Sequence, residues 1–181
     1  MAIGSIKPKH WKGMSLKMSV PSQAESRRPR PLAMQIKWHP PEQPWIKINT
    51  DGAVSTTGKA GGGGVIRDHD GKLFAAFATP LGTQSALEAE LLAISHGLGL
   101  AKELNRPMWI ESDSEQTIKL FNGTGWGPAY IRRVMARLVI FKQQHNIRAS
   151  FIHRKGNKAA DWLAKWSLDQ TNFGNMSEQT P

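Results

Sequence analysis

The sequence predicts an α/β fold in which helices lie on both faces of a five-stranded mixed β-sheet. Three patterns support this fold class. Residues 45–79 contain three short runs of strand-forming residues separated by glycine-containing turns, which is typical of antiparallel strands. Leucine and isoleucine then recur at helical spacing between Leu87 and Leu98. Strand and helix signals alternate from there to residue 168, and a β-α-β crossover of this kind adds parallel strands to the sheet.

The three antiparallel strands are predicted from alternation and turn chemistry. Ile46–Thr50 alternates apolar and polar residues and is followed by Asp51, which we place at a strand end on the rim of the sheet. The glycines at 61–64 are predicted to begin the second strand. They do not form a phosphate-binding loop, because such a loop requires a following Gly-Lys-Ser/Thr sequence and a helix, and neither is present. Asp68–Gly71 carries the Asp-Gly signal of a hairpin, and Lys72–Thr79 is the third strand.

A long helix is predicted after the third strand. Ser85 and Glu88 have the spacing of a capping box at its start, and Asn105 and Pro107 end it. Glu90 has no part in the capping box, and its position beside the apolar stripe places it near the seam between helix and sheet. The stripe consists of Leu87, Leu91, Ile94 and Leu98.

The second half of the domain is predicted to alternate strands and helices. Asp113 stands where a strand ends and a helix begins, and Asp161 lies in the first turn of the last helix, which Asn157 caps. The first and fourth strands both end in Asp and are candidates for meeting at one sheet edge. The expected elements are a strand at 108–111, a short helix ending near 122, a helix at 129–145, a strand at 147–152 and a helix from 157.

These signals place the domain at residues 45–170, with unstructured segments on either side of it. Residues 1–44 hold seven prolines, eight Lys or Arg and two Glu, a composition typical of a disordered basic tail and linker. Residues 171–181 are expected to form a flexible tail. We favour an intracellular protein of the nucleus or cytoplasm, and the N-terminal segment is also compatible with organelle targeting.

Charge and composition limit the classes of function. The net charge of +10 favours a polyanionic partner, of which nucleic acid is the commonest, although a solvated basic tail explains part of it. The chain has no cysteine, so it holds neither a disulfide framework nor a thiolate metal site. No apolar run approaches the roughly 18 residues of a membrane span, and we expect no membrane partner.

Four acidic residues at predicted strand ends and helix starts are candidates for one site: Asp51, Glu90, Asp113 and Asp161. Each has an ordinary structural explanation on its own, as a turn former, a solvated side chain, an N-cap or a favourable charge at a helix start. Gathered together, four carboxylates repel one another and are stable in ionised form only around cations. Oxygen ligands without His or Cys favour Mg²⁺ or Mn²⁺, and two such ions suit phosphodiester cleavage.

Five segments resemble, in order and spacing, type 1 ribonuclease H, and above all the plant reverse-transcriptase-like RNase H domains. The resemblance covers about residues 45–170 and implies a five-stranded mixed sheet. It implies that the four acids are catalytic and bind two Mg²⁺ ions, for which Mn²⁺ can substitute. It also implies endonucleolytic cleavage of the RNA strand of RNA–DNA hybrids. The matching segments are Ile48–Gly52, Gly64–Asp68, Ser85–Leu91, Glu111–Ser114 and Asn157–Ala164.

The chain departs from the family pattern in two places. Many members carry a mobile His in a loop before the last Asp, but here Phe151 falls on that position and His153 is displaced by two residues, so we assign His153 no catalytic role. The basic protrusion of some bacterial members is missing between Trp126 and the next helix. We therefore assign nucleic-acid contacts to Gly52, Ser85, Ser114, Arg132, Arg133, Arg154 and Asn157.

Two other interpretations stay open. The domain is alternatively a nucleic-acid-binding module of retroelement origin, weakly active or inactive, or a fragment of a longer retroelement product. We expect a monomer, and we expect Trp45, Trp109 and Trp126 to belong to the core.

Overall fold

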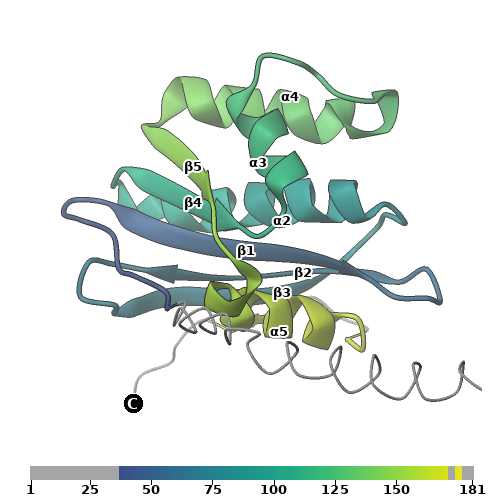
Figure 1. The fold of residues 1–181 in the computed structure, drawn as a ribbon, viewed down its shortest axis with the longest axis horizontal. Helices are drawn as coiled ribbons and strands as arrows, with labels where there is room; N and C mark the ends of the chain where they lie inside the picture. Colours follow the sequence, from purple (N-terminus) through teal and green to yellow (C-terminus); the bar gives the residue numbers. More distant parts are fainter. Residues whose placement is uncertain (1–36, 171–173, 177–181) are drawn as a thin grey trace, which may run out of the picture. The chain divides into compact units, whose positions relative to one another are not determined.

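The computed structural model describes residues 37–170 and 174–176 (Figure 1). In this part of the chain a six-stranded sheet has the strand order β5-β4-β1-β2-β3-β6. β1, β2 and β3 form an antiparallel meander, whereas β4 pairs parallel with β1 and β5 parallel with β4. The predicted five-stranded mixed sheet is therefore confirmed, and β6 extends it. The strands are β1 Ile46–Val54, β2 Ala60–Arg67, β3 Leu73–Leu81, β4 Met108–Ser112, β5 Ile147–Phe151 and β6 Gly174–Met176.

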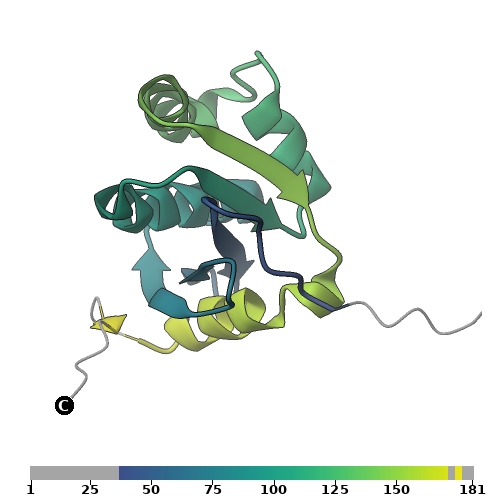
Figure 2. The ribbon, with the colours of Figure 1, turned by 90° about the vertical axis from the view of Figure 1, so that its left-hand side faces the viewer.

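Helices cover both faces of the sheet, as the sequence predicts. α2 and α3 lie on one face with α4 packed over α2, and α5 covers the opposite face (Figures 1 and 2). Ile48 and Leu91 belong to the core between α2 and the sheet, while Leu163 of α5 packs with Val65 and Ala78 on the other side. The helices are α2 Ala86–Ala101, α3 Glu115–Asn122, α4 Arg132–Gln144 and α5 Lys158–Ser167, and single 3₁₀ turns are formed by Lys102–Leu104, Ala129–Ile131 and Arg154–Gly156.

The register of the sheet brings Asp51 of β1 beside the end of β4. β1 continues to Val54, so Asp51 lies inside the strand and not at its end, where the sequence placed it. β1 and β4 run parallel, with Asn49 opposite Glu111, so that Asp51 and Asp113 follow at the same level. Ser85 is the N-cap of α2, and its Oγ accepts a hydrogen bond from the Glu88 backbone N–H at 3.3 Å. This cap fixes the residue at which α2 begins.

The C-terminal edge of the sheet differs from the expectation. Residues Gly174–Met176 form β6, which pairs antiparallel with Ala76–Ala78 of β3, inside the segment 171–181 that the sequence assigned to a flexible tail. Three residues that include a glycine carry no alternation signal, and backbone pairing alone places them on the edge. The rest of that segment and residues 1–36 of the predicted tail lie outside the described residues.

Residues 37–44, which the sequence assigned to the linker, pack against the sheet. The guanidinium carbon of Arg67 lies 3.9 Å from the centroid of a Trp38 ring. Lys47 Nζ donates a hydrogen bond to the carbonyl oxygen of His39 at 2.8 Å. Trp38 and His39 lie outside any alternating segment, so the strand pattern could not predict these contacts. The packed domain includes residues before Trp45.

The three tryptophans expected in the core have different environments. Trp45 and Trp109 are half-buried, and the Arg148 guanidinium carbon lies 4.0 Å and 3.7 Å from their ring centroids. Trp126 is 50% exposed in the loop between α3 and α4, so the core prediction is wrong for this residue. Its neighbours Gly125 and Gly127 offer no apolar side chain that would cover the ring.

The glycine run of β2 lets helices approach both faces of this strand. A Cβ atom added to Gly63 would lie 2.2 Å from the backbone nitrogen of Ala164 in α5. A Cβ on Gly62 would lie 3.3 Å from the Cβ of Ala93 in α2. The predicted close approach of backbone is therefore present, and its main partner is α5, which carries Asp161.

We expect Gly63→Ala to lower the free energy of unfolding by about 2–3 kcal/mol, because the new methyl group would push α5 away from the sheet. Gly99→Ala in α2 is the matched control. No atom lies within 4 Å of a Cβ built there, so this change is expected to stabilise the helix by about 0.5–1 kcal/mol. Urea denaturation of both variants measures the difference. Equal midpoints would contradict the packing argument.

None of the helices in the described part of the chain combines the length and the apolar character needed to cross a bilayer.

Candidate metal centre

Three carboxylates from three different elements meet beside the end of β4. Asp51 lies in β1, Glu90 in α2, and Asp113 directly after β4. One carboxylate oxygen from each residue lies within 4.8 Å of the others. Asp51 is only 7% exposed. The structure thus brings together three of the four acids that the sequence singled out, and we call these three the carboxylate cluster.

Gly52 permits the close approach of α2 to β1 that forms the cluster. A Cβ atom at this position would lie 2.4 Å from the backbone nitrogen of Glu90 and 2.5 Å from the carbonyl carbon of Ala89. Any side chain at Gly52 would therefore separate the helix from the strand and move Glu90 away from Asp51. The role that the structure supports for Gly52 is this spacing.

Ser112 connects the cluster to the start of α3, a role that the sequence pattern did not predict for it. Its Oγ donates a hydrogen bond to Glu90 Oε2 at 3.3 Å and accepts one from the Ser114 backbone N–H at 3.1 Å. Ser114 in turn caps α3, with its Oγ accepting from the Thr117 N–H at 3.3 Å. The available signal was the Ser on each side of Asp113, which predicts a local turn network.

Asp161 stands beside the carboxylate cluster rather than in it. It projects from the first turn of α5, on the face of the sheet opposite α2. Arg154 Nη2 lies 3.0 Å from Asp161 Oδ1, and Lys165 Nζ lies 2.7 Å from Oδ2. The Nε atom of Arg154 is also 4.0 Å from Asp113 Oδ2. Arg154 therefore joins the fourth acid to the cluster, and Lys165, four residues after Asp161, was not foreseen.

Asn157 holds the last helix against the cluster. Its side chain is 1% exposed and makes no capping hydrogen bond to α5, unlike the expected N-cap. Instead, Nδ2 donates to the Thr50 carbonyl oxygen at 2.9 Å and to Asp113 Oδ1 at 3.0 Å. A buried side chain with these partners cannot reach a nucleic acid, so the structure corrects the expected role of Asn157 from binding to positioning.

Burial and mutual repulsion raise the pKa values of two acids in the cluster. Burial, followed by the charges of Asp113 and Asp161, raises the pKa of Asp51 to about 7. Burial, followed by the charges of Asp51 and Asp113, raises the pKa of Glu90 to about 9. In the absence of a cation, full ionisation of the cluster at neutral pH is therefore unfavourable.

The donor set fits a hard divalent cation. Within the described residues the cluster offers only carboxylate oxygens, with Ser112 Oγ beside them and no imidazole ligand in the group. Mg²⁺ and Mn²⁺ prefer such ligands. A positive ion at this position would also relieve the repulsion that raises the pKa values of Asp51 and Glu90.

Asp161 has the opposite electrostatic environment. Partial burial acts to raise its pKa, but hydrogen bonds from Lys165 and Arg154 outweigh this effect and lower the pKa below its ordinary value. The hydrogen bond and charge of Asp161 raise the pKa of Arg154. Asp161 is therefore ionised and paired near neutral pH, whereas Glu90 carries a proton and Asp51 titrates in this range.

The other predicted binding residues lie around the cluster without entering it. Arg132 and Arg133 are exposed in the first turn of α4. Arg133 lines a cavity of about 260 Å³ together with Glu88 of the first turn of α2, two residues before Glu90. His153 is exposed, and its Nδ1 accepts a hydrogen bond from the Lys155 backbone N–H at 3.2 Å. Nothing links His153 to the carboxylates.

A second group of possible metal ligands, Asp68, His69 and Asp70, has a local explanation. Asp68 Oδ1 accepts hydrogen bonds from the backbone N–H groups of Asp70 and Lys72, both at 2.9 Å. This is the usual side-chain support of a hairpin turn, here between β2 and β3. We assign no function to it.

Comparisons with known proteins agree with this geometry. A family model described as "Reverse transcriptase-like" matches residues 49–167. A protein of Arabidopsis thaliana named "Putative ribonuclease H protein" is 34% identical over 137 residues, which are 74% of this chain and 22% of that protein. The chain therefore spans about a fifth of the length of this curated relative.

Solved structures with the same fold include two ribonucleases H. RNase H1 from the halophilic archaeon Halobacterium salinarum has a TM-score of 0.64 at 24% identity, covering 69% of this chain and 98% of that chain. LC11-RNase H1, isolated from compost and solved with an RNA/DNA hybrid, has a TM-score of 0.64 at 23% identity, covering 68% and 96%. The chain belongs to the reverse transcriptase-like family, and its domain has the fold of type 1 ribonuclease H.

Proposed function

We propose that the domain is a metal-dependent endonuclease that hydrolyses the RNA strand of RNA–DNA hybrids. The observation that carries this proposal is the convergence of Asp51, Glu90 and Asp113 within 4.8 Å of one another at the edge of the sheet. The family supports the reaction class, and the RNA/DNA hybrid in the structure of the LC11 protein supports the substrate class.

The carboxylate cluster and Asp161 are the proposed ligands of two Mg²⁺ ions, with Mn²⁺ as a substitute. Bound there, such ions supply an activated water and stabilise the charge on the leaving oxygen. Asp161 is the ligand that needs the largest rearrangement, because it must exchange its ion pairs with Lys165 and Arg154 for a cation.

The chain's own residues fix the geometry of this site. Ser112 orients Glu90 through its hydrogen bond, and Asn157 orients Asp113 while tying it to Thr50 of β1. The side chain of Arg154 is 68% exposed and lies between Asp113 and Asp161, so its free N–H groups are available to a phosphate of the bound strand. These residues position the carboxylates and the substrate without taking part in proton transfer.

Contacts with the nucleic acid backbone are proposed for Arg132, Arg133 and Arg154, with Gly52, Ser85 and Ser114 lining the approach to the carboxylates. Arg133 and Glu88 line the same cavity, so Arg133 lies near the first turn of α2. The net charge of +10 favours such contacts.

We expect an Arg132→Ala and Arg133→Ala double variant to bind a hybrid more weakly and with a weaker salt dependence. Each phosphate contact contributes about −0.9 to the slope of log K against log salt, so the slope should decrease in magnitude by nearly two. Fluorescence anisotropy at several salt concentrations measures it. Lys102→Ala at the far end of α2 is the control. An unchanged slope in the double variant would exclude these arginines from the interface.

Cleavage of a hybrid with a label on each strand tests the proposed function. With Mg²⁺ or Mn²⁺ we expect cuts in the RNA strand alone, and none with EDTA. Tight hybrid binding without cleavage in either metal would favour the alternative, a nucleic-acid-binding module with little activity. The ion pairs of Asp161 are the observation that favours this alternative, since they compete with a cation for the fourth carboxylate.

A further inference from the structure

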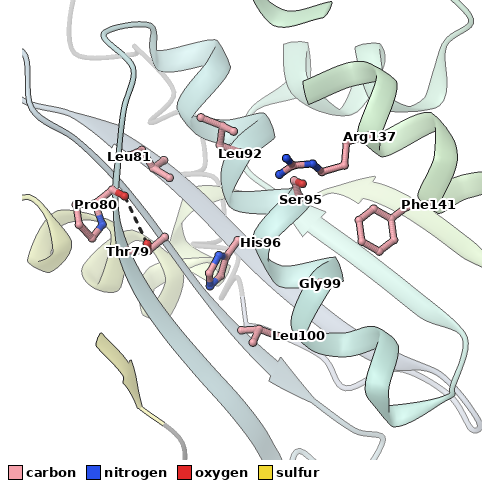
Figure 3. Close-up of a pocket in the computed structure, with 10 residues that line it drawn as sticks. All are labelled: Thr79, Pro80, Leu81, Leu92, Ser95, His96, Gly99, Leu100, Arg137 and Phe141. Carbon is pink, nitrogen blue, oxygen red and sulfur yellow. Dashed lines mark hydrogen bonds between the residues drawn. The ribbon is translucent and has the colours of Figure 1, made fainter. Parts of the chain in front are cut away.

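A cavity of about 380 Å³ lies between the end of β3, the second half of α2, and α4 (Figure 3). β3 contributes residues 79–81, and none of the carboxylates of the metal centre takes part. Its lining holds no acidic residue, which distinguishes it chemically from the carboxylate cluster. The main lining residues from the helices are Leu92, Ser95, His96, Gly99, Arg137 and Phe141.

Two buried polar groups in this lining lack partners. Ser95 is 5% exposed, and its Oγ has no hydrogen-bond partner among the described residues. The Nε2 atom of His96 is buried and equally without a partner, while the ring packs at 4.7 Å from the ring of Phe77. Leaving such groups unsatisfied is costly, and native structures rarely do so without a ligand or water to complete them.

Arg137 gives the cavity a positive charge. The residue is exposed on α4, and in the part of the chain that the structure describes no carboxylate lies within 4.0 Å of its guanidinium group. Figure 3 shows its side chain beside Ser95, with His96 extending from α2 toward Thr79 of β3. Burial lowers the pKa of His96, so the imidazole is neutral and adds a hydrogen-bonding group without adding charge. The polar end of the cavity therefore complements an anion.

The remaining wall is apolar and is kept open by a glycine. Leu92 and Phe141 face the cavity from two helices. Gly99 sits in the interior of α2, where alanine would stabilise the helix, and no atom lies within 4 Å of a Cβ built there. Gly97, two residues earlier, faces the sheet instead, and its Cβ would lie 2.8 Å from Ile48 Cγ2. Packing against the sheet therefore requires glycine at position 97. At position 99 no packing contact requires glycine, and the missing side chain leaves space in the cavity.

We propose that this cavity binds a small amphipathic anion, with a carboxylate or phosphate head held by Arg137 and Ser95 and an apolar body against Leu92 and Phe141. This site lies outside the metal centre and does not depend on the proposed nuclease function. His96 lies on the β3 side of the cavity, where its unpartnered Nε2 adds a hydrogen-bonding group.

Nuclear magnetic resonance titration of the ¹⁵N-labelled full chain tests the proposal. The probes are octanoate, octyl phosphate, the neutral analogue octanamide, and inorganic phosphate. We expect octanoate or octyl phosphate to shift the resonances of Ser95, His96 and Gly99 with a Kd of about 0.1–1 mM, and octanamide to bind about tenfold more weakly. Stronger binding of octyl phosphate would identify a phosphate head, and stronger binding of octanoate a carboxylate head.

Matched variants localise the binding. Arg137→Gln should weaken octanoate about tenfold without affecting octanamide, whereas Arg132→Gln on the same helix removes the same charge and should leave both unchanged. Gly99→Leu should fill the cavity and abolish the shifts. Two results would overturn the proposal. One is the absence of shifts at Ser95, His96 and Gly99 with every probe. The other is binding of inorganic phosphate as tight as that of octyl phosphate, which would leave no role for the apolar wall.

Discussion

An Asp51→Asn variant is expected to lose RNA-strand cleavage by about a thousandfold or more, because the substitution removes a charged ligand from the centre of the carboxylate cluster. Asp51 is the acid on which the others converge: it lies within 4.8 Å of Glu90 and Asp113, and its pKa responds to Asp113 and Asp161. Single-turnover cleavage of a labelled hybrid at saturating Mg²⁺ measures the loss of rate.

The control for this variant separates lost chemistry from lost folding. Glu103→Gln removes an exposed carboxylate at the other end of α2 and should cleave at the wild-type rate. In the absence of metal, Asp51→Asn itself should unfold at a higher urea concentration than the wild type near pH 8, because it removes a charge from a repelling group. A residual rate within about tenfold of the wild type would contradict the role of Asp51.

The metal-free domain is expected to lose stability as the pH rises from 7 to 9, and Mg²⁺ is expected to restore it. Asp51 has a pKa of about 7 and Glu90 a pKa of about 9 in the folded state, both above the ordinary values for these groups. The folded state therefore binds more protons than the unfolded state in this window, and the stability due to those protons is lost as they dissociate. The expected loss is about 2–3 kcal/mol, mostly from Glu90.

The window from pH 7 to 9 isolates the cluster from other titrating groups. The lowered pKa of His96 affects stability only below the ordinary His range, and the lowered pKa values of Asp161 and Asp68 act at still lower pH. Urea midpoints at both pH values, with and without millimolar Mg²⁺, measure the effect. Glu90→Gln should show a much flatter pH dependence. A wild-type midpoint that does not fall, or that falls equally with Mg²⁺ present, would contradict the link between repulsion and cation binding.

The sequence predicted β1 to β5, the helices and the convergence of the first and fourth strands because those signals are local, whereas β6 carries no such signal. Alternation marked β1, a capping box marked α2, and Asp after a strand marked the end of β4. For Glu90 the sequence predicted only a position near the seam between helix and sheet, and not its approach to Asp51. The cause of this approach is the absence of a side chain at Gly52, where β1 contacts Ala89 and Glu90 of α2, and this contact between distant segments is visible only in three dimensions.

The errors have a common physical origin in contacts without a sequence period. Asn157 has the residue type and position of an N-cap, but its amide binds Thr50 and Asp113 instead. Trp38 packs on Arg67 from a proline-rich segment that carries no strand or helix pattern. Asp161 was grouped with the other acids by its place at a helix start, and it stays a proposed ligand. Its pairing with Lys165 and Arg154 could not be predicted, because it depends on the geometry of α5.

Calorimetric titration of the full chain with Mn²⁺ at pH 7.5, beside Glu90→Gln, tests the cation site at the carboxylate cluster most directly. We expect saturable binding with release of protons, since Asp51 and Glu90 must ionise to bind the ion, and binding at least about tenfold weaker in the variant. Equal binding by the two proteins, or binding without proton release in buffers of different ionisation enthalpy, would contradict a cation site at Asp51, Glu90 and Asp113.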